Sequence, residues 1–484
     1  MSNALPPSPS AAPARRSTRP RKRLLGNGTG TASVLGRGAG RPAVAPAGLA
    51  AAGRDCAEPA VGGLLPVVGA DLCVPLVGGG TARYANLDYG ATAPALERVA
   101  ERVAEVLPYY GSVHRGAGLP ARVSTALYER TRATVARFVG ARDDDVVVFT
   151  RNTTDALNLL AHCLPDTGGD VVVLDAEHHA NLLPWQRRGA RTLAVAPTLR
   201  ETLDRLRAAL AERPAALVAI TGASNVTGEL TPLREVVALA HAAGARVVVD
   251  AAQLAPHRSV DLAGCGADWL ALSGHKLYAP YGAGALVGRG DWLDAAEPYL
   301  AGGGATVDVS EQATVWQSGP ARHEAGTPNL IGAVALAAAC DALDALPDGA
   351  LEAHERSLRE LLLARLTRIP GVGVARIWAD SDAAIGTVAF TVAGFQPAHV
   401  SAYLSAEHGI GVRDGRFCAH RLLARLGLGG GALRASFGVG TSVADVERLA
   451  DALERLVRDG TRWAYAPGPD GWAPVGDDRP LPEL

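Results

Sequence analysis

Lys276 stands out among the residues of this chain that could do covalent chemistry. The 484-residue sequence contains two lysines, Lys22 and Lys276, although lysine and arginine together number 47. Lys276 follows an apolar run at 269–272 that is typical of a buried strand, and it precedes a turn-like stretch at 278–282. A lysine at the end of a buried strand is suited to Schiff-base formation, because burial lowers its pKa and frees the amine lone pair. Position alone leaves a solvated surface lysine equally open.

A carboxylate, an amide and two hydroxyls also follow strand-like runs. Asp250 ends the run 246–250, where a buried charge is costly unless it is paired. The pyridinium nitrogen of a cofactor such as pyridoxal phosphate needs such a partner, and Gln253 could donate to the neighbouring ring oxygen. Thr153 and Thr154 lie where a strand gives way to a helix, so backbone N–H groups there could bind an anion. Ordinary helix capping is the competing interpretation for Asp250 and for the threonines.

Two adjacent histidines and one cysteine are further candidates. His178 and His179 follow the strand-like run 171–175. Neighbouring side chains point in different directions, so one imidazole stacked on an aromatic cofactor is favoured over a metal pair. Cys418 lies in a glycine-flanked segment with arginine and histidine neighbours that favour a thiolate. The competing interpretation is a buried cysteine that acts as a small hydrophobe.

The elements that must position these residues follow a regular pattern up to about residue 330. Near-continuous Val, Leu and Ile runs alternate with amphipathic helices, which predicts a mostly parallel, doubly wound sheet covered on both faces. In such sheets ligands bind beyond the carboxyl ends of the strands. We expect strands at 145–150, 170–175, 191–196, 216–221, 246–250, 268–272 and 283–287, and helices at 94–107, 121–139, 155–164, 180–188, 199–212 and 232–243.

The two ends of the chain differ from this part in their predicted elements and in their composition. Two long helices, at 331–346 and 350–368, precede short strands and further helices that predict a smaller α+β domain. The first 80 residues are rich in Pro, Gly, Ala and Ser, with a basic cluster at 15–23. This composition predicts a disordered extension, although it is also that of an organellar transit peptide. We therefore expect a disordered basic extension at 1–80, a large α/β domain at 81–330, a small C-terminal α+β domain at 331–460 and an irregular tail at 461–484.

Composition excludes several classes of function. The net charge of −2 gives no excess of positive charge that would indicate binding to nucleic acid. No apolar run reaches the roughly 20 residues that a membrane span needs. The six cysteines are scattered without a C-x-x-C pair, which argues against a structural zinc site or a disulfide scaffold and fits a reducing, cytoplasmic location. No glycine-rich phosphate loop occurs in a strand–loop–helix context, so a dinucleotide or nucleoside triphosphate is not favoured.

The order of the motifs resembles that of a known family. Over about residues 80–460 the chain is similar to the class V aminotransferase-fold enzymes, and most similar to cysteine desulfurases and selenocysteine lyases of the sulfur-mobilisation type. The resemblance implies the type I fold of pyridoxal-phosphate-dependent transferases. The motifs are NLDYGATAP (86–94), HRG (114–116), NTTDALNLL (152–160), EHHANLLPW (177–185), SNVTG (224–228), VDAAQ (249–253), SGHKLYAPYG (273–282), GGG (302–304), EAGTPN (324–329), VRDGRFCAH (412–420) and LRASFG (433–438).

The resemblance implies a role for each matching position. Lys276 would hold pyridoxal 5'-phosphate covalently, His178 would stack on its ring and could act as an acid or base, and Cys418 would be the sulfur-accepting nucleophile. Thr327 would reach the phosphate from the second subunit of a homodimer. The other implied cofactor contacts are Thr153, Thr154, Asp250, Gln253, Ser273 and His275; the implied substrate contacts are Ala91, His114, Arg115, Asn225 and Arg434, and no metal is implied.

The implied reaction is the conversion of L-cysteine to L-alanine. Lys276 would take the Cα proton, and the Cys418 thiolate would attack the substrate sulfur and become a persulfide that a sulfur-acceptor protein could unload. The chain departs from the family at Arg416 and Phe417, where sulfur-mobilising members tend to carry histidines. A class V aminotransferase, epimerase or carbon–sulfur lyase acting on another small amino acid stays open, as does a pyridoxal-phosphate-binding protein without turnover. No nucleic-acid or membrane partner is expected.

Overall fold

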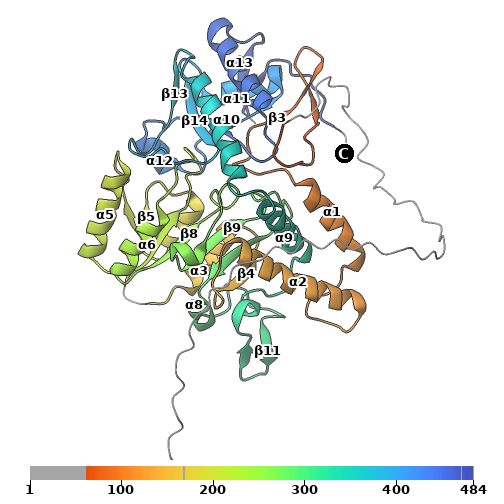
Figure 1. Ribbon diagram of the computed structural model, residues 1–484, viewed down its shortest axis with the longest axis vertical. Helices are drawn as coiled ribbons and strands as arrows, with labels where there is room; N and C mark the ends of the chain where they lie inside the picture. The colour runs from red at the N-terminus through yellow and green to blue at the C-terminus, as the bar shows by residue number, and fades with distance from the viewer. Residues whose placement is uncertain (1–61, 167–168, 470, 483–484) are drawn as a thin grey trace, which may run out of the picture. The chain divides into compact units, whose positions relative to one another are not determined.

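The computed structural model describes residues 62–166, 169–469 and 471–482. A seven-stranded sheet with the order β4-β10-β9-β8-β7-β5-β6 lies at the centre (Figure 1). Neighbouring strands from β6 to β9 run parallel, whereas β10 is antiparallel to both β4 and β9. The mostly parallel sheet expected from the sequence is therefore present. Its strands are β4 (Val146–Thr150), β5 (Asp170–Leu174), β6 (Arg191–Leu193), β7 (Ala215–Thr221), β8 (Arg246–Asp250), β9 (Trp269–Ser273) and β10 (Gly284–Gly288).

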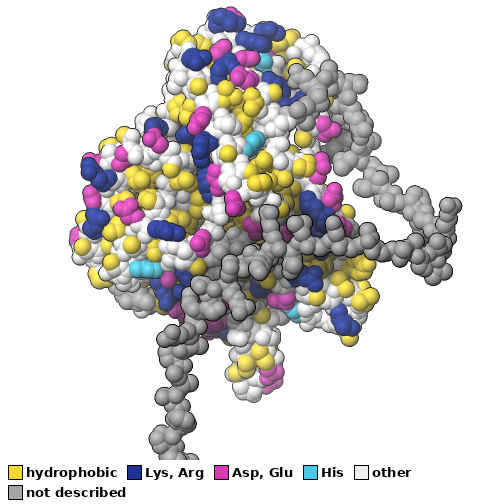
Figure 2. Space-filling model, viewed as in Figure 1, with side chains coloured by type: hydrophobic (Ala, Val, Ile, Leu, Met, Phe, Trp, Pro, Cys, Tyr) yellow, Lys and Arg dark blue, Asp and Glu magenta, His cyan; other side chains and the backbone are white. Residues whose placement is uncertain are grey.

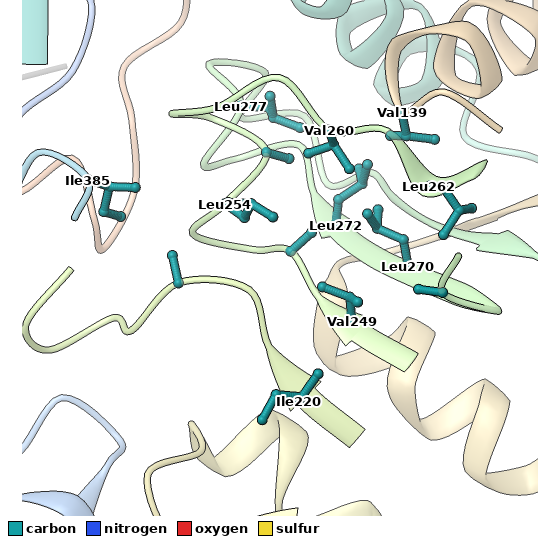
Figure 3. Packing of buried hydrophobic residues seen from close by; sticks show 14 of the residues in the cluster. Val139, Ile220, Val249, Leu254, Val260, Leu262, Leu270, Leu272, Leu277 and Ile385 are labelled. Carbon is teal, nitrogen blue, oxygen red and sulfur yellow. The ribbon is translucent and has the colours of Figure 1, made fainter. Parts of the chain in front are cut away.

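The apolar strands bury both of their faces because side chains alternate across a sheet. Val249, Leu270 and Leu272 contribute to one core, shown in Figure 3, whereas Val248 and Trp269 from the same strands contribute to the core of the opposite face. The main helices of this part are α1 (Glu97–Val106), α2 (Leu119–Phe138), α3 (Thr153–Cys163), α5 (Leu199–Glu212), α6 (Leu233–Ala242) and α9 (Leu330–Asp344).

A second, four-stranded antiparallel sheet has the order β13-β14-β17-β16 and its own apolar core. Its strands are β13 (Val372–Val374), β14 (Thr387–Val392), β16 (Arg413–Gly415) and β17 (Ala432–Ser436), and its helices are α10 (Ala350–Leu366), α11 (Pro397–His408), α12 (His420–Arg425) and α13 (Val443–Asp459).

The position of α9 bears on the domain boundary. This helix packs against α1 and α2 of the larger part, whereas α10 packs against α13 and β13. The sequence-based boundary at 330–331 assigned α9 to the smaller domain. We instead place the boundary between α9 and α10, because the apolar surface of α9 is buried against the larger part.

Residues 62–80 are ordered, so the prediction of a disordered extension is wrong for them; residues 1–61 lie outside the described part. β1 (Cys73–Pro75) pairs with β2 (Thr81–Arg83), and the backbone N–H of Leu64 donates to the carbonyl of Val439. Their composition favours disorder, but the fold supplies backbone partners that composition does not reveal.

The predicted irregular tail at 461–484 is also wrong in part. β18 (Tyr465–Gly468) and β19 (Gly471–Pro474) form an antiparallel hairpin that packs on α11. The ring of Trp472 stacks on His399 with a centroid distance of 4.7 Å and an interplanar angle of 12°. The Tyr465 hydroxyl donates to Glu407 at 3.1 Å. Contacts with a helix about 65 residues away in sequence therefore order the hairpin.

No helix in the described ranges is long and apolar enough to cross a membrane. On the face drawn in Figure 2, acidic and basic side chains are interspersed.

Candidate active site

Residues that follow the carboxyl ends of five strands converge on one cavity with a volume of about 260 Å³. The strands are β4, β5, β7, β8 and β9, and their ends lie together as expected for a sheet of this kind. Residues from β16, β17 and the segment after β16 close the cavity from the smaller sheet. The predicted site residues that line it are Ala91, Thr153, Thr154, His178, Asn225, Asp250, Gln253, Ser273, His275, Lys276, Cys418 and Arg434.

Lys276 lies in the turn that follows β9. The turn is tight because the N–H of Gly274 donates to the carbonyl of Ala283 at 2.7 Å, and a Cβ on Gly274 would lie 2.6 Å from that same oxygen. Burial lowers the pKa of Lys276 to about 8, and the nearby Asp250 carboxylate opposes this shift. A substantial fraction of the amine is therefore uncharged and nucleophilic near neutral pH.

Asp250 and Gln253 hold buried polar atoms that face the cavity. Asp250 accepts a hydrogen bond from the N–H of Ala252 at 3.0 Å, and burial raises its pKa while Lys276 lowers it. Gln253 Nε2 donates to the carbonyl of Gly90 at 2.7 Å, but its Oε1 has no hydrogen-bond partner. A buried polar atom is seldom left unpaired, so these residues fit a polar ring group placed between them.

His178 is fixed by a backbone contact. Its Nδ1 accepts a hydrogen bond from the N–H of Ala180 at 3.0 Å. Burial and then the positive charge of Lys276 lower the pKa of His178 to about 3. The ring is therefore neutral at physiological pH, which favours stacking on an aromatic group over proton transfer.

The N-terminus of α3 forms another wall of the cavity. Asn152, and not either threonine, caps this helix, with its side chain accepting from the N–H of Asp155 at 3.0 Å. Ser273 Oγ lies 2.8 Å from both the N–H and the hydroxyl of Thr153, and Thr154 is exposed on the cavity. The hydroxyls and the helix N-terminus together suit a phosphate group. The neighbouring His275 has Nδ1 3.2 Å from the hydroxyl of Thr92, and burial lowers its pKa.

Arg434 and Asn225 also line the cavity. Arg434 is buried, and it donates from Nη1 to the backbone carbonyl of Asn225 and from Nη2 to Asp88 Oδ1, both at 2.9 Å. Its Nε is buried without a partner. A buried guanidinium with an unused donor is suited to a carboxylate ligand.

Cys418 lies on the rim of the cavity and is exposed. Its carbonyl accepts a hydrogen bond from the N–H of His179 at 2.9 Å, and the rings of His179 and His420 meet edge to face with centroids 4.5 Å apart. Two of the other free thiols are buried: burial raises the pKa of Cys163 to about 12 and that of Cys340 well above its usual value. Exposure and position distinguish Cys418 from them.

Three predicted site residues lie outside the cavity. His114 Nε2 lies 2.9 Å from a Glu129 carboxylate oxygen. Arg115 Nη2 lies 3.5 Å from the carbonyl of Gly326, and the adjacent Thr327 is exposed over a separate hollow. Arg115 and the segment at 326–327 are therefore neighbours, but within one chain they do not meet Lys276.

Comparison with known proteins assigns the family. A model of the family described as aminotransferase class-V matches residues 85–449. The chain belongs to the aminotransferase class-V family.

Members of this family that resemble the chain include named cysteine desulfurases. Probable cysteine desulfurase 2 of Mycobacterium leprae (strain TN) is 41% identical over 392 residues, which are 78% of this chain and 92% of the relative. The crystal structure of cysteine desulfurase CsdA (S-sulfonic acid) from Escherichia coli matches with a TM-score of 0.70 at 36% identity, covering 78% of this chain and 95% of CsdA. The apo structure of a cysteine desulfurase from Thermococcus onnurineus NA1 matches with a TM-score of 0.71 at 35% identity, with the same coverage.

Two acidic residues of this class-V family member contribute to the site although the motif analysis gave them no role. Asp88 pairs with Arg434, and Glu177 is buried with its carboxylate accepting from the N–H of Thr221 at 3.0 Å and from Asn181 Nδ2 at 2.7 Å. Burial raises the pKa of Glu177 to about 8. They lie in the motifs NLDYGATAP and EHHANLLPW, so an acidic residue within such a motif is the signal that could have found them. In the described ranges no group of three His, Cys, Asp or Glu residues could hold a metal ion.

Proposed function

We propose that this class-V family member is a pyridoxal-phosphate-dependent cysteine desulfurase that converts L-cysteine to L-alanine. The observation that carries the proposal is the exposed Cys418 on the rim of the cavity that Lys276 and Arg434 also line. An aminotransferase, epimerase or simple lyase needs the amine and the carboxylate site but has no use for a thiol at this position. The desulfurases among the relatives support the same activity.

The residues of the cavity fit pyridoxal phosphate. Lys276 would bind it covalently, Asp250 would pair with its ring nitrogen, and His178 would stack on the ring. Gln253 Nε2, which carries a second hydrogen besides the one donated to the carbonyl of Gly90, would donate to the ring oxygen. Thr153 and Thr154 at the N-terminus of α3, with Ser273 at the end of β9 and His275 in the turn after it, would hold the phosphate. The bound group supplies an electron sink for negative charge at the substrate Cα.

The residues of the chain then have distinct tasks. Arg434 and Asn225 bind the substrate carboxylate, and Lys276, with a pKa near 8, takes the Cα proton and later returns one. The Cys418 thiolate attacks the substrate sulfur: a sulfur–sulfur bond forms, the substrate carbon–sulfur bond breaks, and its electron pair stays with the carbon product. Overall, L-cysteine and the Cys418 thiol give L-alanine and a Cys418 persulfide, so atoms and electrons balance. The persulfide sulfur would pass to an acceptor protein.

We further propose a homodimer in the cytoplasm. Arg115 and Thr327 are exposed away from Lys276, which fits contacts with the site of a second copy. The hairpin of β11 (Thr306–Val309) and β12 (Thr314–Trp316) exposes Val307, Val309 and Val315, and hydrophobic side chains are visible on it at the bottom of Figure 2. Such a surface is typical of a protein interface. A reactive thiol that carries a persulfide suits a reducing compartment.

The test is an amino-acid panel applied to the purified full-length protein with pyridoxal phosphate and a thiol reductant. We expect L-cysteine to yield equal amounts of L-alanine and sulfide. Formation of a keto acid from another amino acid, with no alanine from L-cysteine, would replace the desulfurase with an aminotransferase.

A further inference from the structure

Phe417 and Cys418 both have a left-handed backbone, with φ values of 49° and 51°. Among the described residues they are the only two consecutive non-glycine residues with positive φ. Such a conformation is strained for a residue that carries a Cβ, so it persists only where neighbouring contacts hold it. The position of the Cys418 thiol therefore depends on the contacts that stabilise this pair.

Two of these contacts come from the wall assigned to the substrate carboxylate. Asn225 Nδ2 donates to the carbonyl of Phe417 at 2.8 Å, and the Arg434 guanidinium carbon lies 5.3 Å from the centre of the Phe417 ring. The Phe417 side chain is buried. A third contact, from the N–H of His179 to the carbonyl of Cys418, comes from the outer side. Phe417 thus touches both groups that would receive a carboxylate and is bonded directly to Cys418.

The two receiving groups keep unused donors. Arg434 Nε is buried without a partner, and an amide nitrogen such as Nδ2 of Asn225 carries two hydrogens, one of which is directed at Phe417. A carboxylate bound to these donors would restrict the amide and the guanidinium that hold Phe417. Binding of a carboxylate would therefore change how firmly Asn225 and Arg434 hold the left-handed backbone at Phe417 and Cys418. Because coupling is reciprocal, the conformation of this pair would also change the affinity of the site for a carboxylate.

We propose that Phe417 is a positioning residue that couples occupation of the carboxylate site to the position of the Cys418 thiol. When a carboxylate is bound, the Asn225 amide and the Phe417 ring hold the Cys418 thiol over the cavity. When the carboxylate site is empty, the thiol has a wider range of positions. The inference rests on the proposed function for the assignment of Asn225 and Arg434 to the substrate carboxylate. It gives the chain a means of presenting the thiol when a substrate is in place.

The test measures thiol reactivity and needs no turnover. The full-length protein with its cofactor is treated with iodoacetamide, and the alkylation rates of Cys418 and of the partly exposed Cys265 are followed by peptide mass spectrometry. We expect saturating L-alanine to change the alkylation rate of Cys418 by at least about fivefold and to leave the alkylation rate of Cys265 unchanged. L-Alaninamide, which lacks the carboxylate, should have no such effect. An unchanged Cys418 rate with saturating L-alanine would overturn the proposal.

Variants separate coupling from simple shielding of the thiol by the ligand. Phe417→Leu removes the ring from Arg434 but keeps the backbone carbonyl that accepts from Asn225, so we expect L-alanine still to bind while its effect on the alkylation rate of Cys418 is at least about halved. Phe417→Tyr keeps the ring and should retain the effect. Phe390→Leu should retain it too: Phe390 pairs with Leu433 on β17, so its buried ring lies on the face of the sheet opposite the Arg434 side chain. An undiminished effect in Phe417→Leu, with binding of L-alanine verified by calorimetry, would show shielding and contradict coupling. A protein that couples normally yet forms no alanine from L-cysteine would disprove the desulfurase activity alone.

Discussion

Arg434 and Asp88 form a 2.9 Å ion pair between residues 346 positions apart in the sequence. Asp88 directly follows β3 (Ala85–Asn86) and Leu87, and it forms an isolated parallel bridge with Ser436 at the end of β17, the strand that carries Arg434. Because Arg434 is buried, burial lowers its pKa, and the Asp88 carboxylate opposes that shift. Asp88 thus stabilises the buried guanidinium charge and orients the group, while Nε stays available to a ligand.

Replacement of Asp88 by asparagine should destabilise the protein. Asp88→Asn retains an oxygen that can accept from Arg434 but removes the counter-charge of a buried cation, so we expect the free energy of unfolding to fall by about 1–3 kcal/mol. Saturating L-alanine should restore part of the loss, because its carboxylate supplies a new counter-charge. Chemical denaturation with and without L-alanine measures both effects. Asp341→Asn is the control, since Asp341 pairs with the exposed Arg137, and its effect should stay below about 0.5 kcal/mol. Equal losses in the two variants would contradict the role given to Asp88.

The pKa of Lys276 predicts the pH dependence of cofactor binding. Burial lowers that pKa to about 8, so the amine is increasingly uncharged as the pH rises through 8, and only the uncharged amine attacks the cofactor aldehyde. We expect the rate of pyridoxal phosphate incorporation into the apoprotein to rise with pH and level off above about pH 8. Stopped-flow absorbance measures this rate.

Two variants sharpen this pH experiment. Asp250→Asn removes the carboxylate that favours the charged amine, so the midpoint of the profile should move to lower pH. Lys276→Ala should incorporate no cofactor covalently, as judged by borohydride reduction and mass spectrometry. A wild-type midpoint near 10, the ordinary value for lysine, would mean that burial does not control the amine.

Removal of the Cys418 thiol should separate cofactor binding from desulfuration. Cys418→Ala should bind pyridoxal phosphate and L-cysteine as the wild type does but form L-alanine at least about 100-fold more slowly, because no thiolate accepts the sulfur. Mass spectrometry of the wild type after turnover should show a gain of about 32 Da, one sulfur atom, on the Cys418 peptide. Cys265→Ala should keep the wild-type rate. Full alanine formation by Cys418→Ala would exclude the persulfide route.

The C-terminal hairpin should contribute to stability and not to chemistry. Trp472→Ala removes the ring that stacks on His399, so we expect the free energy of unfolding to fall by about 1–3 kcal/mol. Val475→Ala, at a residue that is 60% exposed in the same tail, should change it by less than about 0.5 kcal/mol. Thermal denaturation followed by circular dichroism compares the two variants. The Michaelis constant for L-cysteine should be unchanged in both, since the hairpin does not line the cavity.

The sequence by itself determined the alternation of strands and helices and most of the chemistry at their ends. Apolar runs such as 246–250 and 269–273 are strands in the structure because only a sheet covered on both faces buries both sides of them. The carboxyl ends of parallel strands meet at one edge. The sequence was therefore enough to predict that Lys276, Asp250 and His178 lie close together, and all three line the same cavity.

Only the tertiary structure decided which groups are already paired and which are left unpaired. The bond between Asp88 and Arg434 and the contact of Asn225 with Phe417 join residues about 190 to 350 positions apart, which no local pattern reveals. The left-handed backbone at Phe417 and Cys418 opposes local preference and is held by those distant contacts. Likewise, residues 62–80 and the hairpin of β18 and β19 are ordered by surfaces elsewhere in the chain. Local sequence sets the propensity of a segment, whereas burial and hydrogen-bond partners depend on what the fold brings against it.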